Sequence, residues 1–407
     1  MRTPGDSYGA GAGPLRPRRV ILPDNGKDLL RTELALAFEE LGFSVLRARP
    51  EALHDQHGAG YLPRLLDEGP ALLFSVNMQG VLPGGAGSKM LAKAVARHDL
   101  EVVLWFVDNP WHVLSGMRDP DWKIFTLAVT DRSFVEPLRR AGARRVEHLP
   151  LAVDPRLARQ SGVEPPSAGA RSAGLPGGAL REVVFAGRTA FPGKETFFAG
   201  LELPPALLEE AGLMGLQGRR ADFDWWLKRL HLEQTALWPG KKSRLPGFGA
   251  AHSNKIWREQ RLLAVLEQTA CGLTLFGDSA WRADLRKAGS RLDLRPPFDY
   301  YAYAHRLYRQ AAFSLNLNSL LLGAGLTQRI FDIWSVQGFC LTDDSPGLEI
   351  FPAELTRPVT FSTPEELAER IAYFQARPGQ KQELSLAWRG HILREHTYTN
   401  RLASLLF

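Results

Sequence analysis

Cysteine is scarce in this sequence, and no stretch is apolar for long enough to span a membrane. The two cysteines, Cys271 and Cys340, lie in or beside expected strands. Two isolated thiols form no metal-ligand cluster and are expected to be buried and reduced. No apolar run reaches the roughly 20 residues of a transmembrane helix, and residues 1–19 lack the apolar core of a signal peptide. We therefore expect a cytoplasmic protein.

Dense positive charge is also missing. The chain has 50 Lys and Arg residues against 44 Asp and Glu, a formal net charge of +6 at pH 7. These cations are scattered, except near residues 16–19 at the end of a Gly/Pro-rich tail, residues 1–18, that we expect to be disordered. Nucleic-acid binding needs clustered cations, so we exclude nucleic acid as a partner. The basic excess suits an anionic substrate and permits loose association with an acidic membrane surface.

Metal motifs and internal repeats are absent as well. No Asp-x-Asp motif stands out, and Asp343-Asp344 is expected to end a strand and open a turn. We therefore expect no metal and no other cofactor. Without a repeat, the halves of the chain share no obvious sequence identity.

Strand and helix patterns alternate in two series, which predicts an α/β fold with two Rossmann-like parallel-sheet domains. Between the series, residues 156–180 are rich in Pro, Gly, Ser and Ala, as an interdomain linker is. The expected strands are residues 20–22, 43–46, 71–76, 102–107 and 124–128, then 182–186, 273–276, 313–317 and 339–342.

The linker divides the chain into an N-terminal domain, residues 19–155, and a C-terminal domain, residues 181–385. A C-terminal helix is expected over residues 386–407. Residues 200–250 have a helical pattern and form an expected insertion in the second domain. We expect this insertion to border the cleft between the domains.

The stretch from residue 308 to residue 351 is typical of a phosphate site. The strand alternation of residues 313–318 breaks at Gly323 and Gly325, and Thr327 is an expected N-cap. Glycines let the backbone approach a ligand closely, and the free amides of a first helical turn point at an anion.

Two side chains of the following helix suit a nucleotide. Arg329 can offer a forked donor to phosphate, and Asp332, nearly one turn later, can accept from ribose hydroxyls. The alternative is an ordinary αβ unit in which the glycines make turns and Arg329 and Asp332 form a solvated pair.

The run from residue 315 to residue 351 resembles the C-terminal part of the CgeB-like (spore-maturation type) glycosyltransferases. Trp105 to Pro110, His148 to Pro155, Phe361 to Leu367 and Glu395 to Tyr398 resemble other parts of that family in the same order. The likeness covers most of residues 100–155 and 255–405. It implies GT-B architecture, in which two Rossmann-like domains face each other across a cleft and the C-terminal one holds most of the donor nucleotide.

Within this resemblance, the loops after two other strands become donor-site candidates. Gly187 and Arg188, with Lys194 shortly after, are expected to face the donor diphosphate and stabilise the leaving group. Gly277 looks like a family loop near the nucleotide base. In the alternative interpretation, Arg188 is a surface cation beside a turn and Asp278 caps a helix.

The acceptor side is expected in the first domain, after the strand at residues 102–107. Asp108 is a candidate general base for an acceptor hydroxyl, and His112, which ordinarily titrates near neutrality, is the alternative base. Alternatively, Asp108 only organises the turn before Pro110. Asp131 is expected to be an N-cap.

One departure from the family pattern matters. Many retaining GT-B enzymes carry two Glu residues eight positions apart, and here Asp332 matches the second while Ala324 stands at the first. The missing acid leaves the stereochemical outcome open.

Our leading hypothesis is a glycosyltransferase that moves a sugar from a nucleotide-diphosphate donor to a hydroxyl on a protein or surface glycan. The second hypothesis is a non-catalytic GT-B-like protein that binds a nucleotide or glycan, because fold does not guarantee chemistry.

Overall fold

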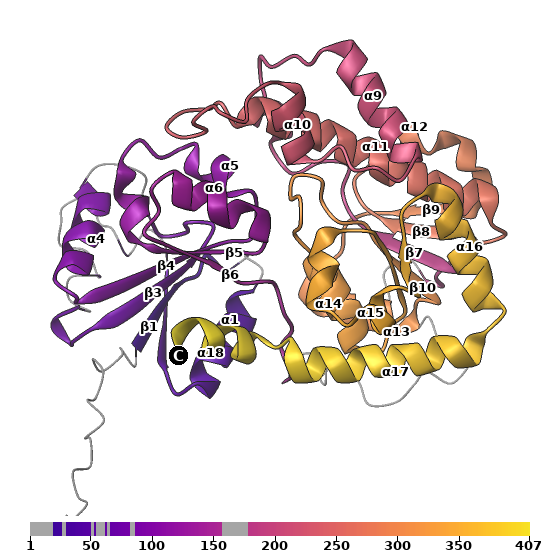
Figure 1. The fold of residues 1–407 in the computed structure, drawn as a ribbon. Helices are drawn as coiled ribbons and strands as arrows, with labels where there is room; N and C mark the ends of the chain where they lie inside the picture. The colour runs from indigo at the N-terminus through magenta and orange to yellow at the C-terminus, as the bar shows by residue number, and fades with distance from the viewer. Residues whose placement is uncertain are drawn as a thin grey trace, which may run out of the picture.

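The protein is represented by a computed structural model that describes residues 19–26, 30–49, 53, 62, 66–81, 86–156 and 178–407. The expected tail, residues 1–18, and residues 157–177 of the expected linker lie outside these described residues. Two α/β domains stand side by side, each a sheet flanked by helices (Figure 1). The expected fold class is thus confirmed.

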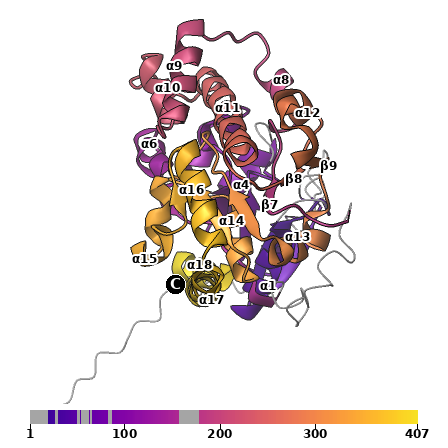
Figure 2. The ribbon, with the colours of Figure 1, turned by 90° about the vertical axis from the view of Figure 1, so that its right-hand side faces the viewer.

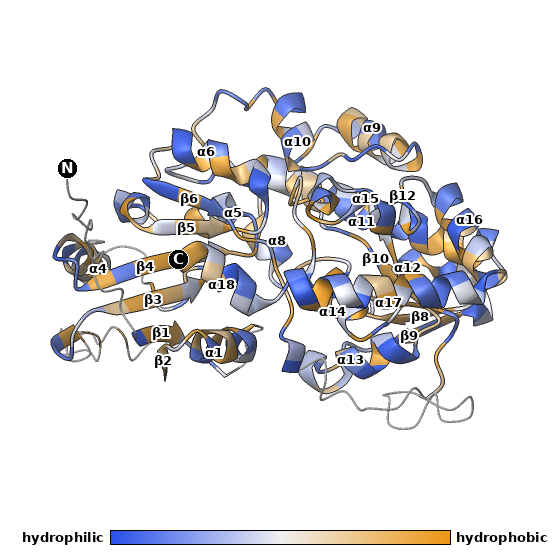
Figure 3. Cartoon of the chain, turned by 60° about the horizontal axis from the view of Figure 1, so that its bottom comes forward, coloured by the Kyte–Doolittle hydropathy of each residue, from blue (hydrophilic) through white to orange (hydrophobic). Residues whose placement is uncertain are grey.

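The first sheet is six-stranded and parallel, in the order β2-β1-β3-β4-β5-β6. Its central strands are nearly continuous apolar runs, because helices cover both faces of a parallel sheet (Figure 3). The strands are β1 (Arg19–Pro23), β2 (Ser44–Ala48), β3 (Ala71–Val76), β4 (Leu100–Phe106), β5 (Thr126–Val129) and β6 (Arg145–His148). The helices named below are α1 (Arg31–Glu40), α5 (Pro110–Leu114) and α6 (Val135–Arg140).

The second sheet is also six-stranded and parallel, in the order β12-β11-β10-β7-β8-β9. The four expected strands are present, together with two edge strands that the sequence patterns did not indicate, β9 and β12. The strands are β7 (Val183–Ala186), β8 (Leu273–Phe276), β9 (Leu292–Arg295), β10 (Phe313–Asn316), β11 (Cys340–Asp343) and β12 (Thr360–Phe361).

Helices of the second domain cover this sheet, as the turned view shows (Figure 2). They are α8 (Lys194–Phe197), α9 (Pro205–Leu216), α10 (Phe223–Arg229), α11 (Arg244–Gln268), α12 (Trp281–Asp284), α13 (Tyr300–Gln310), α14 (Gln328–Ser335), α15 (Ala353–Thr356), α16 (Pro364–Gln375) and α17 (Pro378–Glu395). The last helix is α18 (Tyr398–Leu406). In the described part of the chain, no helix is both long and apolar enough to cross a membrane.

The expected insertion is helical and packs against both domains. It contains α9, α10 and the start of α11, at the top of Figure 1. Phe223 and Trp226 are buried in one apolar cluster with Trp111 and Trp122 of the first domain. Trp238 donates its indole N–H to the carbonyl of Met117 at 3.0 Å. The insertion therefore joins the domains through a shared core.

The C-terminal segment crosses back to the first domain. α17 runs along the second domain, and α18 packs against α1 of the first (Figure 1). The prediction of one helix over residues 386–407 is wrong, because the helix breaks between α17 and α18. The backbone of His396 and Tyr398 hydrogen-bonds to Val153 at 3.0 Å each, and Thr397 caps α18. These bonds take the place of helical ones.

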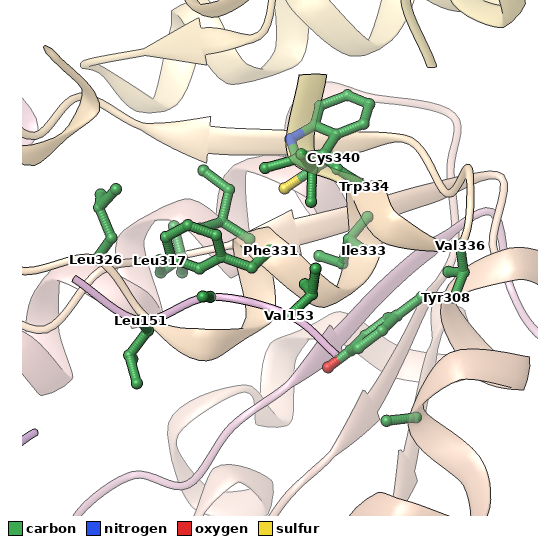
Figure 4. Close-up of a cluster of buried hydrophobic side chains, with 14 of the residues drawn as sticks. Leu151, Val153, Tyr308, Leu317, Leu326, Phe331, Ile333, Trp334, Val336 and Cys340 are labelled. Atoms are coloured by element: carbon green, nitrogen blue, oxygen red, sulfur yellow. The ribbon is translucent and has the colours of Figure 1, made fainter. Parts of the chain in front are cut away.

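Large aromatic rings hold the second domain together next to the segment that connects it to the first. The rings of Trp334 and Trp388 are stacked with centroids 4.8 Å apart, and both side chains are fully buried. Figure 4 shows Leu151 and Val153 of the connecting segment beside Phe331 in the same cluster. The crossing between domains is thus part of the core.

We expect Trp388→Ala to lower the free energy of unfolding by about 3–5 kcal/mol, because it removes the stacked partner of Trp334 and leaves a cavity. Equilibrium urea unfolding followed by circular dichroism measures this change. Leu386→Ala, on the same helix but 49% exposed, is the matched control and should change stability by less than about 0.5 kcal/mol. Equal losses in both variants would contradict the packing role.

Candidate functional site

The glycine loops after β7 and β8 lie against each other at the carboxyl edge of the second sheet. The Gly187 amide donates to the carbonyl of Phe276 at 2.9 Å, and the indole of Trp281 donates to the Gly187 carbonyl at 2.9 Å. A Cβ on Gly277 would lie 2.6 Å from that carbonyl oxygen. Glycine is therefore required by close packing, and the two predicted loops form one wall.

Cations gather beside this wall. Arg188 is exposed, and its carbonyl accepts from Nη1 of Arg258 at 2.9 Å. Burial lowers the pKa of Arg258, the nearby Arg329 adds to this shift and Asp343 opposes it; the resulting pKa is about 10. Nη1 of Arg329 donates to Oδ1 of Asn316 at 3.2 Å. The guanidinium groups of Arg258 and Arg329 thus repel each other.

Further cations come from α8 and α11. Burial lowers the pKa of Lys194; Glu195 opposes this shift and Lys255 adds to it. Burial also lowers the pKa of His252, and both lysines lower it further. Lys255 is paired with Asp284 at 2.8 Å. Together, these groups form a positive cluster, although Asp284, Glu195 and Asp343 offset part of its charge.

Sequence reasoning found Arg188, Lys194 and Arg329 but missed three members of this cluster. His252, Lys255 and Arg258 lie three residues apart on α11 and therefore share one face of that helix. This spacing was a readable signal, although a basic face on a long helix is usually solvated.

Thr327 stands at the N-cap position of α14, as predicted, but its side chain does not cap the helix. Its hydroxyl donates instead to Oδ1 of Asn316 at 2.6 Å. A Cβ on Gly325 would lie 2.7 Å from the Leu322 side chain, so this loop also needs glycine. The first turn of α14 thus has no side-chain cap and begins beside Arg329.

A buried polar network shapes the loop before α14. The amide and the side chain of Asn318 both donate to Oδ1 of Asp343 at 2.8 Å. Oδ2 of Asp343 accepts from the indole of Trp257 at 2.9 Å and from Arg220 at 3.2 Å. Burial raises the pKa of Asp343, while Arg220 opposes that shift. Asp343 ends β11, as predicted, and its carboxylate serves this network.

Asp332 is buried in the second turn of α14, with 4% of its surface exposed. One of its oxygens accepts from the Tyr300 hydroxyl, and the other accepts from Nε2 of Gln328 at 2.9 Å. Nε2 of His305 lies 3.9 Å away. The alternative of a solvated Arg329–Asp332 pair is therefore wrong, because Asp332 faces the protein interior.

In the first domain, Asp108 follows β4 and accepts from Nδ2 of Asn77 at 2.7 Å. Surrounding protein raises the pKa of Asp108 by desolvation, and the Asn77 bond opposes this, although the residue still reaches solvent. Asn109, not Asp108, caps α5 by accepting from the Trp111 amide at 3.1 Å. Nδ2 of Asn109 donates to the Leu321 carbonyl at 3.1 Å, so the turn beside Asp108 touches the second domain.

His112 does not titrate near neutrality, and that prediction is wrong. Its Nε2 lies 3.3 Å from the carbonyl of Ser243, and its ring packs edge-on against Phe197, Phe198 and Phe223. Burial lowers the pKa of His112 to about 4. The imidazole is therefore a neutral packing group between the first domain and the insertion.

Asp131 is an N-cap, as predicted, and also contacts the second domain. Its Oδ1 accepts from the Ser133 amide at 2.8 Å, and its Oδ2 accepts from the Ala324 amide at 3.1 Å. Arg132 forms an ion pair with Glu349 across the same boundary. Ala324, which stands where many retaining enzymes carry an acid, is thus hydrogen-bonded to the first domain.

A second group of titratable side chains lies where α1 meets the second domain. Glu33 accepts from the Tyr301 hydroxyl at 2.9 Å, and that hydroxyl accepts from the Leu30 amide at 2.7 Å. Burial raises the pKa of Glu33, and Asp332 and Asp154 add to the rise, whereas hydrogen bonds from its own backbone amide and from Tyr301 oppose it; the resulting pKa is about 7. Sequence reasoning missed Glu33, since its helical pattern carries no sign of this burial. Among the described residues, no group of three or more His, Cys, Asp or Glu side chains is arranged to hold a metal ion.

Comparisons with known proteins agree with this architecture. Residues 258–406 match the profile of a family described as glycosyl transferase-like. The sequence matches no curated protein. The solved glycosyltransferase of Rickettsia africae ESF-5 aligns with a TM-score of 0.51 at 9% identity, over 96% of this chain and 97% of that one.

The phage T4 protein BGT, in complex with its UDP-glucose substrate, aligns with a TM-score of 0.50 at 10% identity, over 95% of this chain and 97% of that one. Identities this low show the fold alone. With its two six-stranded parallel sheets, the chain has the GT-B glycosyltransferase fold, as predicted.

The raised pKa of Glu33 predicts that stability falls as pH rises. The native state holds a proton between pH 4.5 and about 7 that the unfolded chain releases, so this stabilisation is fully present below pH 4.5 and is lost as the pH rises through about 7. The loss should be roughly 3 kcal/mol. Glu33→Gln should flatten this part of the profile in urea unfolding at several pH values. The exposed Glu39→Gln is the control; a profile that Glu33→Gln leaves unchanged would contradict the assignment.

Proposed function

We propose that this protein is a glycosyltransferase of the CgeB-like type that moves a sugar from a nucleotide-diphosphate donor to a hydroxyl on a protein or surface glycan. The positive cluster carries the proposal. Lys194 interacts with Lys255, and Arg258 interacts with Arg329, at the carboxyl edge of the second sheet, where parallel sheets bind ligands. The exposed Arg188 lies beside them, since its backbone carbonyl contacts Arg258. Their mutual repulsion is relieved by a ligand with at least two negative charges, as a diphosphate has.

Each part of the donor has a partner in this arrangement. The cluster and the uncapped first turn of α14 bind the diphosphate. Gly187, Gly277 and Gly325 let the loops around this site pack closely on the protein, because neighbouring protein atoms already fill the space beside each glycine. Asp332 accepts from ribose, because each carboxylate oxygen can accept more than the one bond it receives from Tyr300 or Gln328.

Asp108 is the proposed general base. The proton of the acceptor hydroxyl moves to its carboxylate, the acceptor oxygen bonds to the anomeric carbon, and the bond from that carbon to the diphosphate breaks. The nucleotide diphosphate leaves with the electron pair of that bond, and the cations stabilise the added charge. The raised pKa of Asp108 favours proton uptake. We place this activity in the cytoplasm.

One observation favours a second candidate, a GT-B-like protein that binds a nucleotide or glycan without turnover. Ala324 has no carboxylate to offer the donor sugar, and its backbone amide donates a hydrogen bond to Asp131. Such a protein would bind the donor and release no nucleotide from it. Turnover separates the two candidates.

We expect one class of UDP-, GDP- or TDP-linked sugars, and not CMP-linked sugars, which lack a diphosphate, to raise the melting temperature of the protein. Arg258→Ala and Arg329→Ala should each weaken the affinity at least tenfold, because each removes a charged donor to phosphate. Thermal shift against ligand concentration measures this. Arg357→Ala, an exposed arginine outside the cluster, should bind like the wild type. No shift with any nucleotide sugar would overturn the donor-site assignment.

Asp108→Asn should slow nucleotide release from the donor by roughly 10²- to 10⁴-fold and leave donor affinity unchanged, because the amide cannot take the acceptor proton. A coupled assay of released nucleotide, with candidate acceptors, measures this rate. His112→Asn should retain the rate within a few-fold if the protein stays folded. Wild-type binding without release for any donor would favour the binding protein instead.

A further inference from the structure

A small cavity of about 10 Å³ lies beside Asp332, at the junction of the two domains. It has walls from both sides: Glu33 of α1 comes from the first domain, and Asp154 comes from the segment that leaves it. The remaining lining residues, from α13 and α14, are Tyr300, Tyr301, His305 and Gln328. Gln328 is the first residue of α14, so the cavity opens beside the proposed phosphate end of that helix.

The cavity is rich in hydrogen-bond acceptors. Glu33, Asp154 and Asp332 are 7%, 4% and 4% exposed. Arg156 satisfies Asp154, since its side chain donates to both carboxylate oxygens, at 3.0 and 2.7 Å. Asp332 accepts from Tyr300 and Gln328.

Glu33 receives the fewest side-chain hydrogen bonds of the three carboxylates. Among the described residues, Tyr301 is its one side-chain donor, to Oε2 at 2.9 Å, and its own backbone amide also lowers its pKa by hydrogen bonding. A carboxylate oxygen can accept more than one hydrogen bond, so a ligand hydroxyl that enters the cavity can donate to Glu33. The cavity therefore suits a ligand that presents O–H donors, and neighbouring hydroxyls would reach Glu33 and Asp332 together.

We propose that Glu33 binds the ribose of the donor nucleotide, an inference that rests on the proposed function. The Glu33 carboxylate accepts from one ribose hydroxyl while Asp332 accepts from the other. The donor is then held by both domains. A cavity of this size admits a single hydroxyl, so the Glu33–Tyr301 contact opens to let the nucleoside enter and closes over it. Binding of ribose thereby favours the closed arrangement of the domains.

Calorimetric titration at pH 8, where Glu33 is ionised, tests the proposal. The probes are UDP, GDP, and the 2′-deoxy and 3′-deoxy forms of each. The wild type should bind one ribonucleotide at least tenfold more tightly than one of its deoxy forms, as expected for a hydrogen bond to a charged acceptor. Glu33→Met should abolish that preference and leave the affinity for the same deoxy form unchanged.

This comparison separates binding from a structural role, because a misplaced helix would weaken every nucleotide equally. Glu33→Gln is the second variant in case Glu33→Met does not fold, and it should reduce the preference. Exposed Glu39→Gln should keep it. The inference would be overturned if the Glu33 variants lost affinity equally for the ribo and deoxy forms, or if they kept the wild-type preference for the ribo form. In either case, nucleotide binding that depends on Arg329 would still support the proposed function. If no nucleoside diphosphate binds the wild type, the proposed function fails as well.

Discussion

The side chain of Gln328 hydrogen-bonds to three segments that meet where the two domains join. Its amide nitrogen donates to the carbonyl of Ala152, at 2.8 Å, and to Asp332, and its oxygen accepts from the hydroxyl of Tyr398 at 2.7 Å. One residue thus ties the connecting segment, the proposed donor helix and the returning C-terminal helix together. Loss of this amide would leave three buried polar groups without their partner, and each costs about 1–3 kcal/mol. These bonds therefore help to fix both the relative position of the domains and the geometry beside Asp332.

The helical insertion also connects the two domains, through α11. α11 presents Lys255 and Arg258 to the positive cluster, while Gly247 near its start lies so close to His112 that a Cβ there would meet the ring at 2.1 Å. Close packing of Gly247 against His112 thus holds α11, the helix that carries these cations, against the first domain. A shift of the domains would displace part of the anion site, and this connects domain closure with donor binding.

Much of the candidate site could be predicted because it depends on local patterns. Glycine next to strand ends, an N-cap such as Thr327 and a cation such as Arg329 follow from neighbouring residues and from family resemblance. His112 shows the limit of this reasoning. Its chemistry in isolation suggests a base, but contacts with Phe197 and Phe223, far away in the chain, bury the ring and lower its pKa. Burial is a property of the assembled molecule.

The sequence by itself determined two parallel-sheet domains, a helical insertion and the loops at the strand ends, because apolar periodicity and turn residues act over a few positions. Only the tertiary structure decided which distant groups meet. Glu33 reads as an ordinary polar position of an amphipathic helix, yet it lies against Tyr301, 268 residues later. The spacing of Arg329 and Asp332 is compatible with a solvated pair, yet Asp332 is buried. The physical reason is that desolvation and charge repulsion depend on neighbours in space, which the order of residues along the chain does not specify.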